Sequence, residues 1–284
     1  MSILVFGAGG QVGRALAAFA DVRAVGRKEA DLEIPGAASA LISRCRPPAI
    51  INAAAYTAVD RAEHEPDLAH RINEHAAAEM AAEAADLGIP FIHLSTDYVF
   101  DGTGEDPHQP DAPANPINAY GKSKRAGERA VLRVYPDAVI LRTSWVFSET
   151  GTNFVKTMLR LSETKTMLRV VADQVGGPTA AAEIAAAAHR IAQLKMSGLG
   201  HKGLYHYSGV PETSWADFAR EVFRQSGRST LVTDMSSAEY PTPAQRPLNS
   251  RLNCQRVAED FGIEQPDWRD GLAHVLQKLR DEAA

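Results

Sequence analysis

Apolar runs alternate with amphipathic, alanine-rich segments through the first half of the chain. The apolar runs predict strands, and their consecutive apolar residues are typical of strands that helices cover on both faces of a sheet. They lie at residues 3–6, 22–25, 49–52, 91–95 and 138–142. The segments between them predict helices that begin near Gln11, Gly36, Pro66 and Asn118. This alternation predicts an α/β fold with a doubly wound parallel sheet of the Rossmann type.

The pattern becomes less regular after about residue 145. Helical periodicity continues, with short strand-like pieces such as residues 204–207 between the helices. The predicted helices cover residues 152–162, 180–195, 215–225 and 268–280. We therefore expect a dinucleotide-binding domain over residues 1–145 and a smaller, mixed α/β substrate-binding region over 146–284, with some chain crossing back. Nothing between the two has the composition of a flexible linker.

Composition and charge exclude some kinds of partner and site. The 284 residues are 45% hydrophobic and 23% charged, which is ordinary for a folded protein with a core of its own. The net charge of -5 comes without a basic block, so we expect no nucleic-acid or anionic-membrane partner. Cys45 and Cys254 stand far apart, outside any metal-ligand or disulfide pattern. No run approaches ~18 apolar residues and no secretion signal is evident, so we expect a cytoplasmic protein.

A glycine-rich turn follows directly after the first predicted strand. Residues 7–13 read GAGGQVG and lead into an alanine-rich helix. Glycine lets the backbone turn sharply and approach a pyrophosphate held at a helix N-terminus. The succession of strand, turn and helix therefore predicts a dinucleotide site that includes Gly7, Gly10 and Gly13.

Two further strand ends are expected to border this site. The second strand is followed by Arg27 and Lys28, where folds selective for NAD usually place an acidic residue. The basic pair would suit the 2′-phosphate of NADP, and it would equally suit a solvated turn. Asp31 and Leu32 come next, beside the expected adenine. The third strand ends in small residues, 53–55, which would let backbone lie close to a flat ligand or simply pack well.

The sharpest chemical signal is a tyrosine four residues before a lysine. On a helix, Tyr120 and Lys124 share one face. A free phenol has a pKa of ~10 and donates its proton poorly unless a cation stabilises the phenolate, a role that Lys124 would fill. Thr96 ends the fourth strand, where open parallel sheets place their ligands, and would hydrogen-bond the carbonyl oxygen that Tyr120 protonates. Each feature alone has a plain structural explanation, but together they favour catalysis.

These residues resemble the extended short-chain dehydrogenase/reductase family, and within it the branch that reduces dTDP-4-dehydro-L-rhamnose. The strings STDYVFDG at residues 95–102 and RTSW at 142–145 are typical of that branch. The resemblance implies that NADPH, or NADH in its place, delivers hydride to the C4 ketone and gives dTDP-L-rhamnose for cell-surface polysaccharide. It also implies that Tyr120 is the proton donor, that Lys124 holds the nicotinamide ribose and lowers the pKa of the phenol, and that Thr96 steadies the developing alkoxide.

The residue patterns and the resemblance together assign the binding residues. The cofactor would contact Gly7, Gly10, Gln11, Val12, Gly13, Arg27, Asp31, Leu32, Ala55, Tyr56, Thr57, Tyr120 and Lys124. The dTDP-sugar would contact Thr96, Asp97, Tyr120, Trp145, Gln174 and Arg246. Trp145 would stack on the sugar, with a core aromatic as the alternative. Arg246 would bind the diphosphate, with a surface salt bridge as the alternative.

Metal-bridged assembly is expected to be absent. Some relatives are described as joining two subunits through a magnesium ion held by glutamates, one of them in the first turn after the glycine-rich loop. Here that turn has Arg14 and Ala15, although Glu183 is present near the second expected position. Without a full set of carboxylates we expect no bound metal, and a monomer or a homodimer.

Other functions of the same fold compete with this interpretation. A nucleotide-sugar 4,6-dehydratase would carry an acidic residue where this chain has Tyr98, so dehydration is disfavoured. Another nucleotide-sugar 4-ketoreductase or an epimerase remains open. Some homologues are non-catalytic regulatory subunits, but the presence of Thr96, Tyr120 and Lys124 together favours an enzyme.

Overall fold

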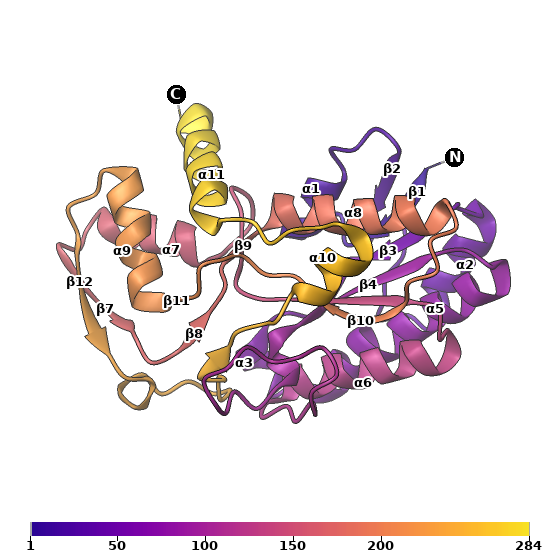
Figure 1. The fold of residues 1–284 in the computed structure, drawn as a ribbon, viewed down its shortest axis with the longest axis horizontal. Coiled ribbons are helices and arrows are strands. Elements are labelled where there is room, and N and C mark those ends of the chain that lie inside the picture. The colour runs from indigo at the N-terminus through magenta and orange to yellow at the C-terminus, as the bar shows by residue number, and fades with distance from the viewer. Residues whose placement is uncertain (1, 284) are drawn as a thin grey trace.

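A six-stranded sheet forms the centre of the protein, for which we have a computed structural model that describes residues 2–283 (Figure 1). All neighbouring strands of the sheet pair in parallel, in the order β10-β5-β4-β3-β1-β2. The strands are β1 (Ile3–Phe6), β2 (Val22–Val25), β3 (Ile50–Asn52), β4 (Phe91–Thr96), β5 (Val139–Thr143) and β10 (Gly203–His206). The predicted Rossmann-type sheet is thereby confirmed, with the predicted strand bounds correct to within one residue.

Helices cover both faces of this sheet. One face carries α1 (Gln11–Leu16), α8 (Ala181–Met196) and α10 (Gln255–Phe261), and the other carries α2 (Ala37–Cys45), α5 (Ala76–Leu87) and α6 (Ala119–Val134). Alternate residues of each strand enter the two cores: Val5 lies in the first and Leu4 in the second. This double burial explains why the strands read as unbroken apolar runs.

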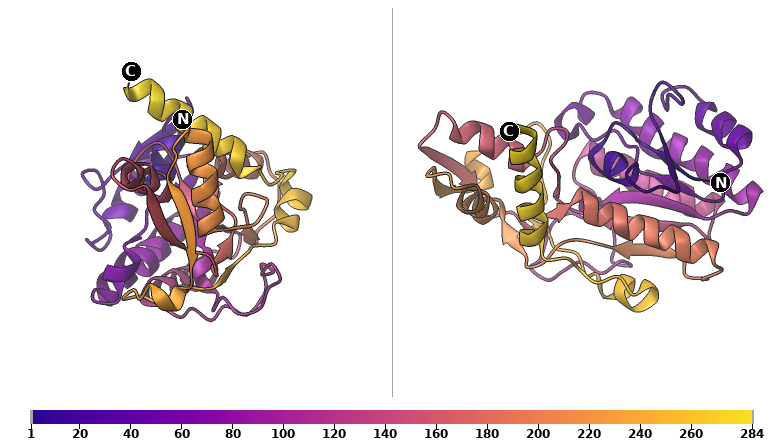
Figure 2. Two further views of the ribbon diagram at one scale, coloured as in Figure 1. Left: turned by 90° about the vertical axis from the view of Figure 1, so that its left-hand side faces the viewer. Right: turned by 90° about the horizontal axis from the view of Figure 1, so that it is seen from above.

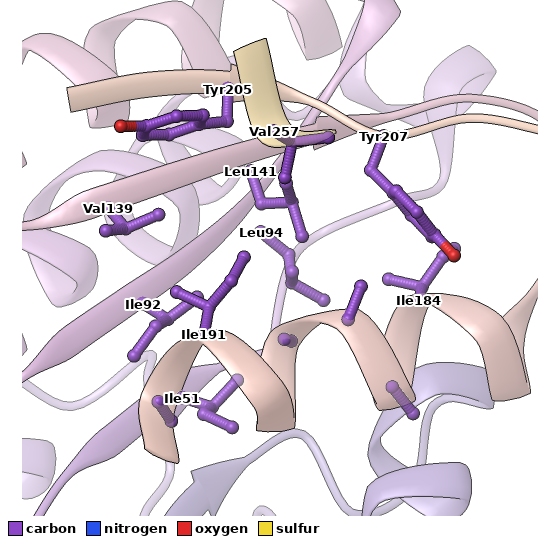
Figure 3. Close-up of a cluster of buried hydrophobic side chains, with 14 of the residues drawn as sticks. Ile51, Ile92, Leu94, Val139, Leu141, Ile184, Ile191, Tyr205, Tyr207 and Val257 are labelled. Carbon is purple, nitrogen blue, oxygen red and sulfur yellow. The ribbon is translucent and has the colours of Figure 1, made fainter. Parts of the chain in front are cut away.

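The helix α8 belongs to the second half of the sequence but packs on the sheet. Figure 3 shows Ile184 and Ile191 of α8 pointing toward Leu94 and Leu141, with Tyr205 of β10 on the far side of the cluster. The strand β10 extends the sheet beyond β5. These returning elements are the chain crossing back that we expected. The predicted boundary at residue 145 itself stays a prediction.

A smaller unit lies beside the sheet, on the left in Figure 1. Its aromatic core includes Phe147, Phe218 and Trp268. Figure 2 shows this unit at one end of the molecule, beyond the sheet. Its elements are β6 (Val146–Phe147), α7 (Phe154–Ser162), β7 (Met167–Val171), β8 (Val175–Gly176), β9 (Thr179–Ala180), β11 (Thr213–Ser214), α9 (Trp215–Ser226), β12 (Leu231–Met235), η3 (Ser237–Glu239), β13 (Asn249–Ser250) and α11 (Trp268–Ala283).

The segment that begins at Pro66 differs from the single helix that the sequence predicted. It consists of α4 (Pro66–His70), a π-helical turn η1 (Arg71–His75) and then α5. The wide turn buries Asn73, whose side chain bonds both backbone groups of Tyr56. The π-helical turn thus lets the buried Asn73 side chain keep its hydrogen bonds, at the expense of regular α-helical geometry. Two short elements complete the fold, α3 (Val59–Ala62) and η2 (Asp97–Val99). No helix within residues 2–283 is long and apolar enough to cross a membrane.

Candidate active site

The glycine-rich turn after β1 is packed too tightly for side chains. Gly7 adopts a φ of +104°, and a Cβ on it would lie 2.8 Å from the backbone of Ala53 at the end of β3. A Cβ on Gly13 would lie 1.9 Å from the carbonyl oxygen of Gly7. Glycine is therefore required at both positions, and the turn can bring its backbone close to a ligand.

A cavity of about 380 Å³ opens beside this turn. It lies at the carboxyl ends of β1 and β3, where the strand order of the sheet reverses and where open α/β sheets bind their ligands. Among the predicted cofactor residues, the cavity is lined by Gly7, Gly10, Gln11, Val12, Arg27, Asp31, Leu32, Ala55 and Thr57. Gly13, Tyr56, Tyr120 and Lys124 lie outside its lining. The glycine backbone, the apolar side chains and the basic Arg27 at the edge of the cavity are suited to binding a dinucleotide.

Arg27, at the edge of the cavity, forms ion pairs with acidic neighbours. The Arg27 guanidinium pairs with Glu33 and lies 3.5 Å from the Asp31 carboxylate. Its side chain is 67% exposed, so this pairing leaves it open to solvent and free to exchange partners. Tyr56, by contrast, is held in place: its N–H donates to Asn73 and its hydroxyl donates to Glu65.

The beginning of α6 positions Tyr120. Asn118 caps the helix by accepting from the N–H of Gly121 at 2.7 Å, and its amide donates to the Gln245 carbonyl at 2.7 Å. A Cβ on Gly121 would lie 2.1 Å from the Tyr98 carbonyl oxygen, so the helix begins directly against η2. Tyr120 is thereby fixed beside the carboxyl end of β4, where the sequence placed it.

Tyr120 and Thr96 meet, as the sequence predicted. The phenol of Tyr120 is buried, and the Thr96 side chain is close enough to it to lower its pKa. Burial raises the pKa of the phenol, the Thr96 side chain lowers it, and the negative charge of Asp97 raises it further. The result is a pKa above the ordinary value. A protonated phenol beside a hydroxyl is an arrangement that can donate a proton to a ketone oxygen.

Lys124 contacts the backbone of β4 and a histidine of the same strand. Its Nζ donates to the Leu94 carbonyl at 2.7 Å and lies 3.3 Å from Nε2 of His93. The lysine is buried, and burial lowers its pKa to about 8. The groups that shift the pKa of Tyr120 are Thr96 and Asp97. Nζ of Lys124 points to the backbone of β4, and the expected lowering of the phenol's pKa by Lys124 stays a prediction.

Asp97 follows Thr96 and is equally buried. Its carboxylate accepts from the Thr96 hydroxyl at 3.0 Å. Burial raises the pKa of Asp97 to about 6, against the opposing effect of hydrogen bonds with Ser250 and Thr96. A carboxyl group of this kind can accept hydrogen bonds from sugar hydroxyls when it is ionised.

The residues predicted to contact the sugar from the second half gather around an aromatic pair. Trp145 adopts a φ of +47°, uncommon for a bulky residue, and stacks on Trp215 with ring centroids 3.6 Å apart. Gln174 accepts from the Trp215 indole at 3.2 Å and donates to Ser237. The structure thus brings Trp145 and Gln174 together through Trp215, which the sequence placed on a helix without assigning it a role.

Arg246 is engaged in a salt bridge. Its guanidinium donates to both carboxylate oxygens of Asp60, at 3.0 and 2.9 Å. The pairing joins the loop after η3 to α3, and it holds the Arg246 side chain near Tyr98. This is the salt bridge that we named as the alternative to diphosphate binding. A role in binding the diphosphate stays a prediction.

A buried ion pair joins α6, the helix that carries Tyr120, to β5. Glu128 of α6 accepts from Arg142 of β5 through both oxygens, each at 2.7 Å, and from the Ser95 hydroxyl at 2.6 Å. Both side chains are almost fully buried, at 0% and 1% exposure. Sequence reasoning missed this pair, although an arginine inside an apolar strand is a signal for a buried partner. Within residues 2–283, no group of three or more His, Cys, Asp or Glu is arranged to hold a metal ion.

Comparisons with known proteins agree with this geometry. A family described as RmlD substrate binding domain matches residues 1–281. The chain is 45% identical to a dTDP-4-dehydrorhamnose reductase of Sinorhizobium fredii over 98% of each chain, and 40% identical to one of Salmonella typhimurium over the same share. Its fold matches a dTDP-4-dehydrorhamnose reductase of Clostridium acetobutylicum with a TM-score of 0.91, at 36% identity over 99% of this chain and 100% of the other. It also matches one of Bacillus anthracis in complex with NADP, with a TM-score of 0.90, at 33% identity over 98% and 100%.

Proposed function

This chain belongs to the RmlD substrate binding domain family, and on that premise we propose that it reduces the C4 ketone of dTDP-4-dehydro-L-rhamnose to dTDP-L-rhamnose. The product serves the synthesis of rhamnose-containing polysaccharide. The observation that carries the proposal is the proximity of the buried Tyr120 phenol and Thr96 at the carboxyl end of β4, the strand beside β3, whose end borders the dinucleotide cavity. The relatives named above, and the NADP bound to one of them, support the same reaction.

NADPH, with NADH as the alternative, is the cofactor that the cavity suits. The close-packed glycines of the turn would let the backbone N–H groups face the pyrophosphate, and Arg27 would face the 2′-phosphate. When bound, the cofactor supplies the hydride. Asp31 and Leu32 would then border the adenine. Ala55 and Thr57 would border the part of the cofactor that extends from the adenine toward the site of reaction.

Tyr120 supplies the proton in this proposal. The proton leaves the phenol oxygen and is taken up by the ketone oxygen as that oxygen becomes an alkoxide. Thr96 hydrogen-bonds the same oxygen and stabilises its developing charge. Because the phenol is buried and protonated, it is ready to donate without waiting for a proton from solvent. Lys124 would hold the nicotinamide ribose from the same helix face.

Residues from both halves of the chain would hold the sugar nucleotide. Asp97 would accept from a sugar hydroxyl, Trp145 would stack on the ring, and Gln174 would bind a polar group beside it. Arg246 would reach the diphosphate if it exchanged its partner Asp60. We assign residues 1–145 with the returning elements to the cofactor and the rest of 146–284 to the substrate, in a cytoplasmic monomer or homodimer.

A spectrophotometric assay tests this function. The purified protein is mixed with dTDP-4-dehydro-L-rhamnose and either NADPH or NADH, and both cofactor oxidation and dTDP-L-rhamnose are measured. We expect one cofactor oxidised for each product molecule. Product without net oxidation would identify an epimerase, and no turnover together with a tightly bound foreign enzyme would identify a regulatory subunit.

Two tyrosine variants locate the chemistry. Tyr120→Phe is expected to lower turnover by ~100-fold or more while NADPH still binds, because it removes a positioned general acid. Tyr135→Phe at the other end of α6 removes a hydroxyl that donates to the Ile89 carbonyl, and it serves as the matched control. Turnover by Tyr120→Phe that equals the control would refute the assignment.

A further inference from the structure

Three buried polar side chains form a row beneath the candidate active site. Asn52 of β3 and His93 of β4 are paired in the register of the sheet, and Lys124 reaches them from α6. Their exposures are 1%, 0% and 2%. Nδ2 of Asn52 lies 3.0 Å from Nδ1 of His93, and Nε2 of His93 lies 3.3 Å from Nζ of Lys124. The imidazole therefore links the lysine to the neighbouring strand.

The backbone fixes the direction of the hydrogen bonds in this row. The side-chain oxygen of Asn52 accepts from the N–H of Ala54 at 3.1 Å. Its NH₂ group must then face His93 and donate to Nδ1. Burial, the largest cause, lowers the pKa of His93 well below its ordinary value, so that the ring is neutral. A neutral ring that accepts at Nδ1 carries its proton on Nε2.

The proton on Nε2 of His93 points at Lys124. An ammonium group has three donors and no acceptor, so it cannot receive this hydrogen bond. A neutral amine can accept from Nε2–H while it donates to the Leu94 carbonyl, which lies 2.7 Å away. The contacts around Lys124 are therefore all satisfied only when the lysine is an amine.

We propose that His93, oriented by Asn52, is a positioning residue that holds Lys124 through a hydrogen bond from Nε2–H to the lysine amine and so couples the proton of the lysine to the tautomer of the histidine. An ammonium at Lys124 requires Nε2 to accept, which moves the ring proton to Nδ1 and turns the Asn52 amide around. The N–H of Ala54 then loses its acceptor. Ala54 lines the dinucleotide cavity, so the proton state of the lysine is linked to the backbone that borders the cofactor site.

The charged groups around Lys124 affect its pKa less than burial does. Glu128, one turn along α6, raises the pKa of the lysine, but its own charge is paired with Arg142 and Arg125. Burial has the larger effect and lowers the pKa to about 8. In the elements packed against α6, several charged groups are paired with each other, namely His70 with Glu74, Arg71 with Glu79 and Asp60 with Arg246. Asp97 acts on Tyr120 and on Tyr98. None of these groups is among those that shift the pKa of Lys124.

The coupling has a consequence for the proposed reaction. This consequence rests on the role that the proposed function gives to Lys124. A lysine whose amine is stabilised by His93 gives up its proton more readily than an exposed lysine does. The hydrogen bond with His93 therefore sets the pH above which Lys124 loses the positive charge that the proposed function places beside the nicotinamide ribose.

Magnetic resonance of the intact protein tests the inference without using activity. The tautomer of His93 is read from long-range nitrogen–proton spectra of ¹⁵N-histidine-labelled wild-type protein. We expect the proton on Nε2 at a pH above the midpoint of Lys124. A proton on Nδ1 under these conditions would overturn the proposal, and this measurement does not depend on any variant folding.

The lysine is measured in parallel with ¹³C-lysine label, and its signal is identified by its loss in Lys124→Met. His93→Gln introduces an oxygen that can accept from the ammonium, so the midpoint of Lys124 is expected to rise by about one pH unit, a tenfold gain in proton affinity. His206→Gln is the matched control, because His206 is equally buried but contacts Arg142 instead. Equal midpoints in His93→Gln and the control would refute the coupling.

The pH dependence of kcat separates this inference from the proposed role of Lys124. If the ammonium is required for turnover, kcat falls as the pH rises through the lysine midpoint, and this limb moves to higher pH in His93→Gln. A shift of the lysine midpoint without a shift of the kcat limb would uphold the coupling and refute the catalytic role of Lys124.

Discussion

The buried pair of Glu128 and Arg142 gives the most quantitative prediction. Arg142→Met keeps the bulk of the side chain and removes the guanidinium, so the Glu128 carboxylate loses two hydrogen bonds of 2.7 Å and the more deeply buried of its two cationic partners. It keeps those from Ser95 and Arg125. Because both members of the pair are almost wholly buried, water cannot replace what is lost.

Leaving one member of a buried pair alone costs about 3–5 kcal/mol of unfolding free energy. For a protein of this size one kcal/mol corresponds to about 2–4 °C, so we expect the melting temperature to fall by about 6–20 °C. Replacing both residues, as in Glu128→Leu with Arg142→Met, is expected to recover part of this loss, because no unpaired charge is then buried.

Thermal unfolding followed by circular dichroism measures the effect. Lys202→Met breaks an exposed ion pair with Asp137 and serves as the control, with an expected loss of under about 1 kcal/mol. A melting temperature of Arg142→Met that matches this control would show that the buried charge is solvated in some other way, and the reasoning would fail.

The same pair predicts a dependence of stability on pH. Burial raises the pKa of Glu128, but the hydrogen bonds and charge of Arg142 outweigh burial and hold the pKa below its ordinary value of 4.5. A group whose pKa is lowered by folding contributes stability above its unfolded pKa and loses it as the pH falls through the folded value. The difference in stability between wild type and the double variant, which lacks this carboxyl group, is therefore expected to be constant above pH 4.5 and to change as the pH falls below it.

Three further substitutions probe the site. Gly13→Ala is expected to abolish NADPH binding or folding, because its Cβ would lie 1.9 Å from a backbone oxygen, whereas Gly9→Ala, with no atom within 4 Å, is expected to fold normally in calorimetry. Trp215→Ala removes the ring that stacks on Trp145, and the KM for the dTDP-sugar is expected to rise by about 2- to 13-fold, from about 0.5–1.5 kcal/mol, while the KM for NADPH is unchanged. Asp97→Asn is expected to remove an inflection near pH 6 from kcat/KM for the sugar, since burial raises the pKa of this carboxyl to about 6 and the ionised form accepts from hydroxyls more strongly than the protonated form; a wild-type profile without that inflection would contradict the assignment.

Local patterns were sufficient for most of the fold. The strands could be predicted because each is a run of apolar residues buried on both faces, and the helix starts because glycine, proline and asparagine mark them. Gly36 and Asn118 indeed occupy the N-caps of α2 and α6. The turn at residues 7–13 could be placed because its spacing follows from sterics that act within the turn.

Contacts between distant segments could not be predicted in the same way. The sequence put Lys124 on the face of Tyr120, but its direction depends on the Leu94 carbonyl and on His93, which belong to another strand. The stacking of Trp215 on Trp145 joins residues 70 positions apart and depends on the smaller unit being folded. A histidine within the apolar run of β4 was the available signal for the row beneath the site, and it points to a partner without naming it.

The late position of α8 and β10 in the chain has a consequence for biosynthesis. The nascent polypeptide emerges from the ribosome with β1, β3, β4 and β5 long before α8, which covers one of their faces, and before β10, which closes their edge. Until α8 has emerged, only α1 covers that face, and most of its apolar side chains are available to chaperones or to other chains. We infer that translation pauses between residues 145 and 206 would favour aggregation, whereas pauses after residue 206 would be tolerated.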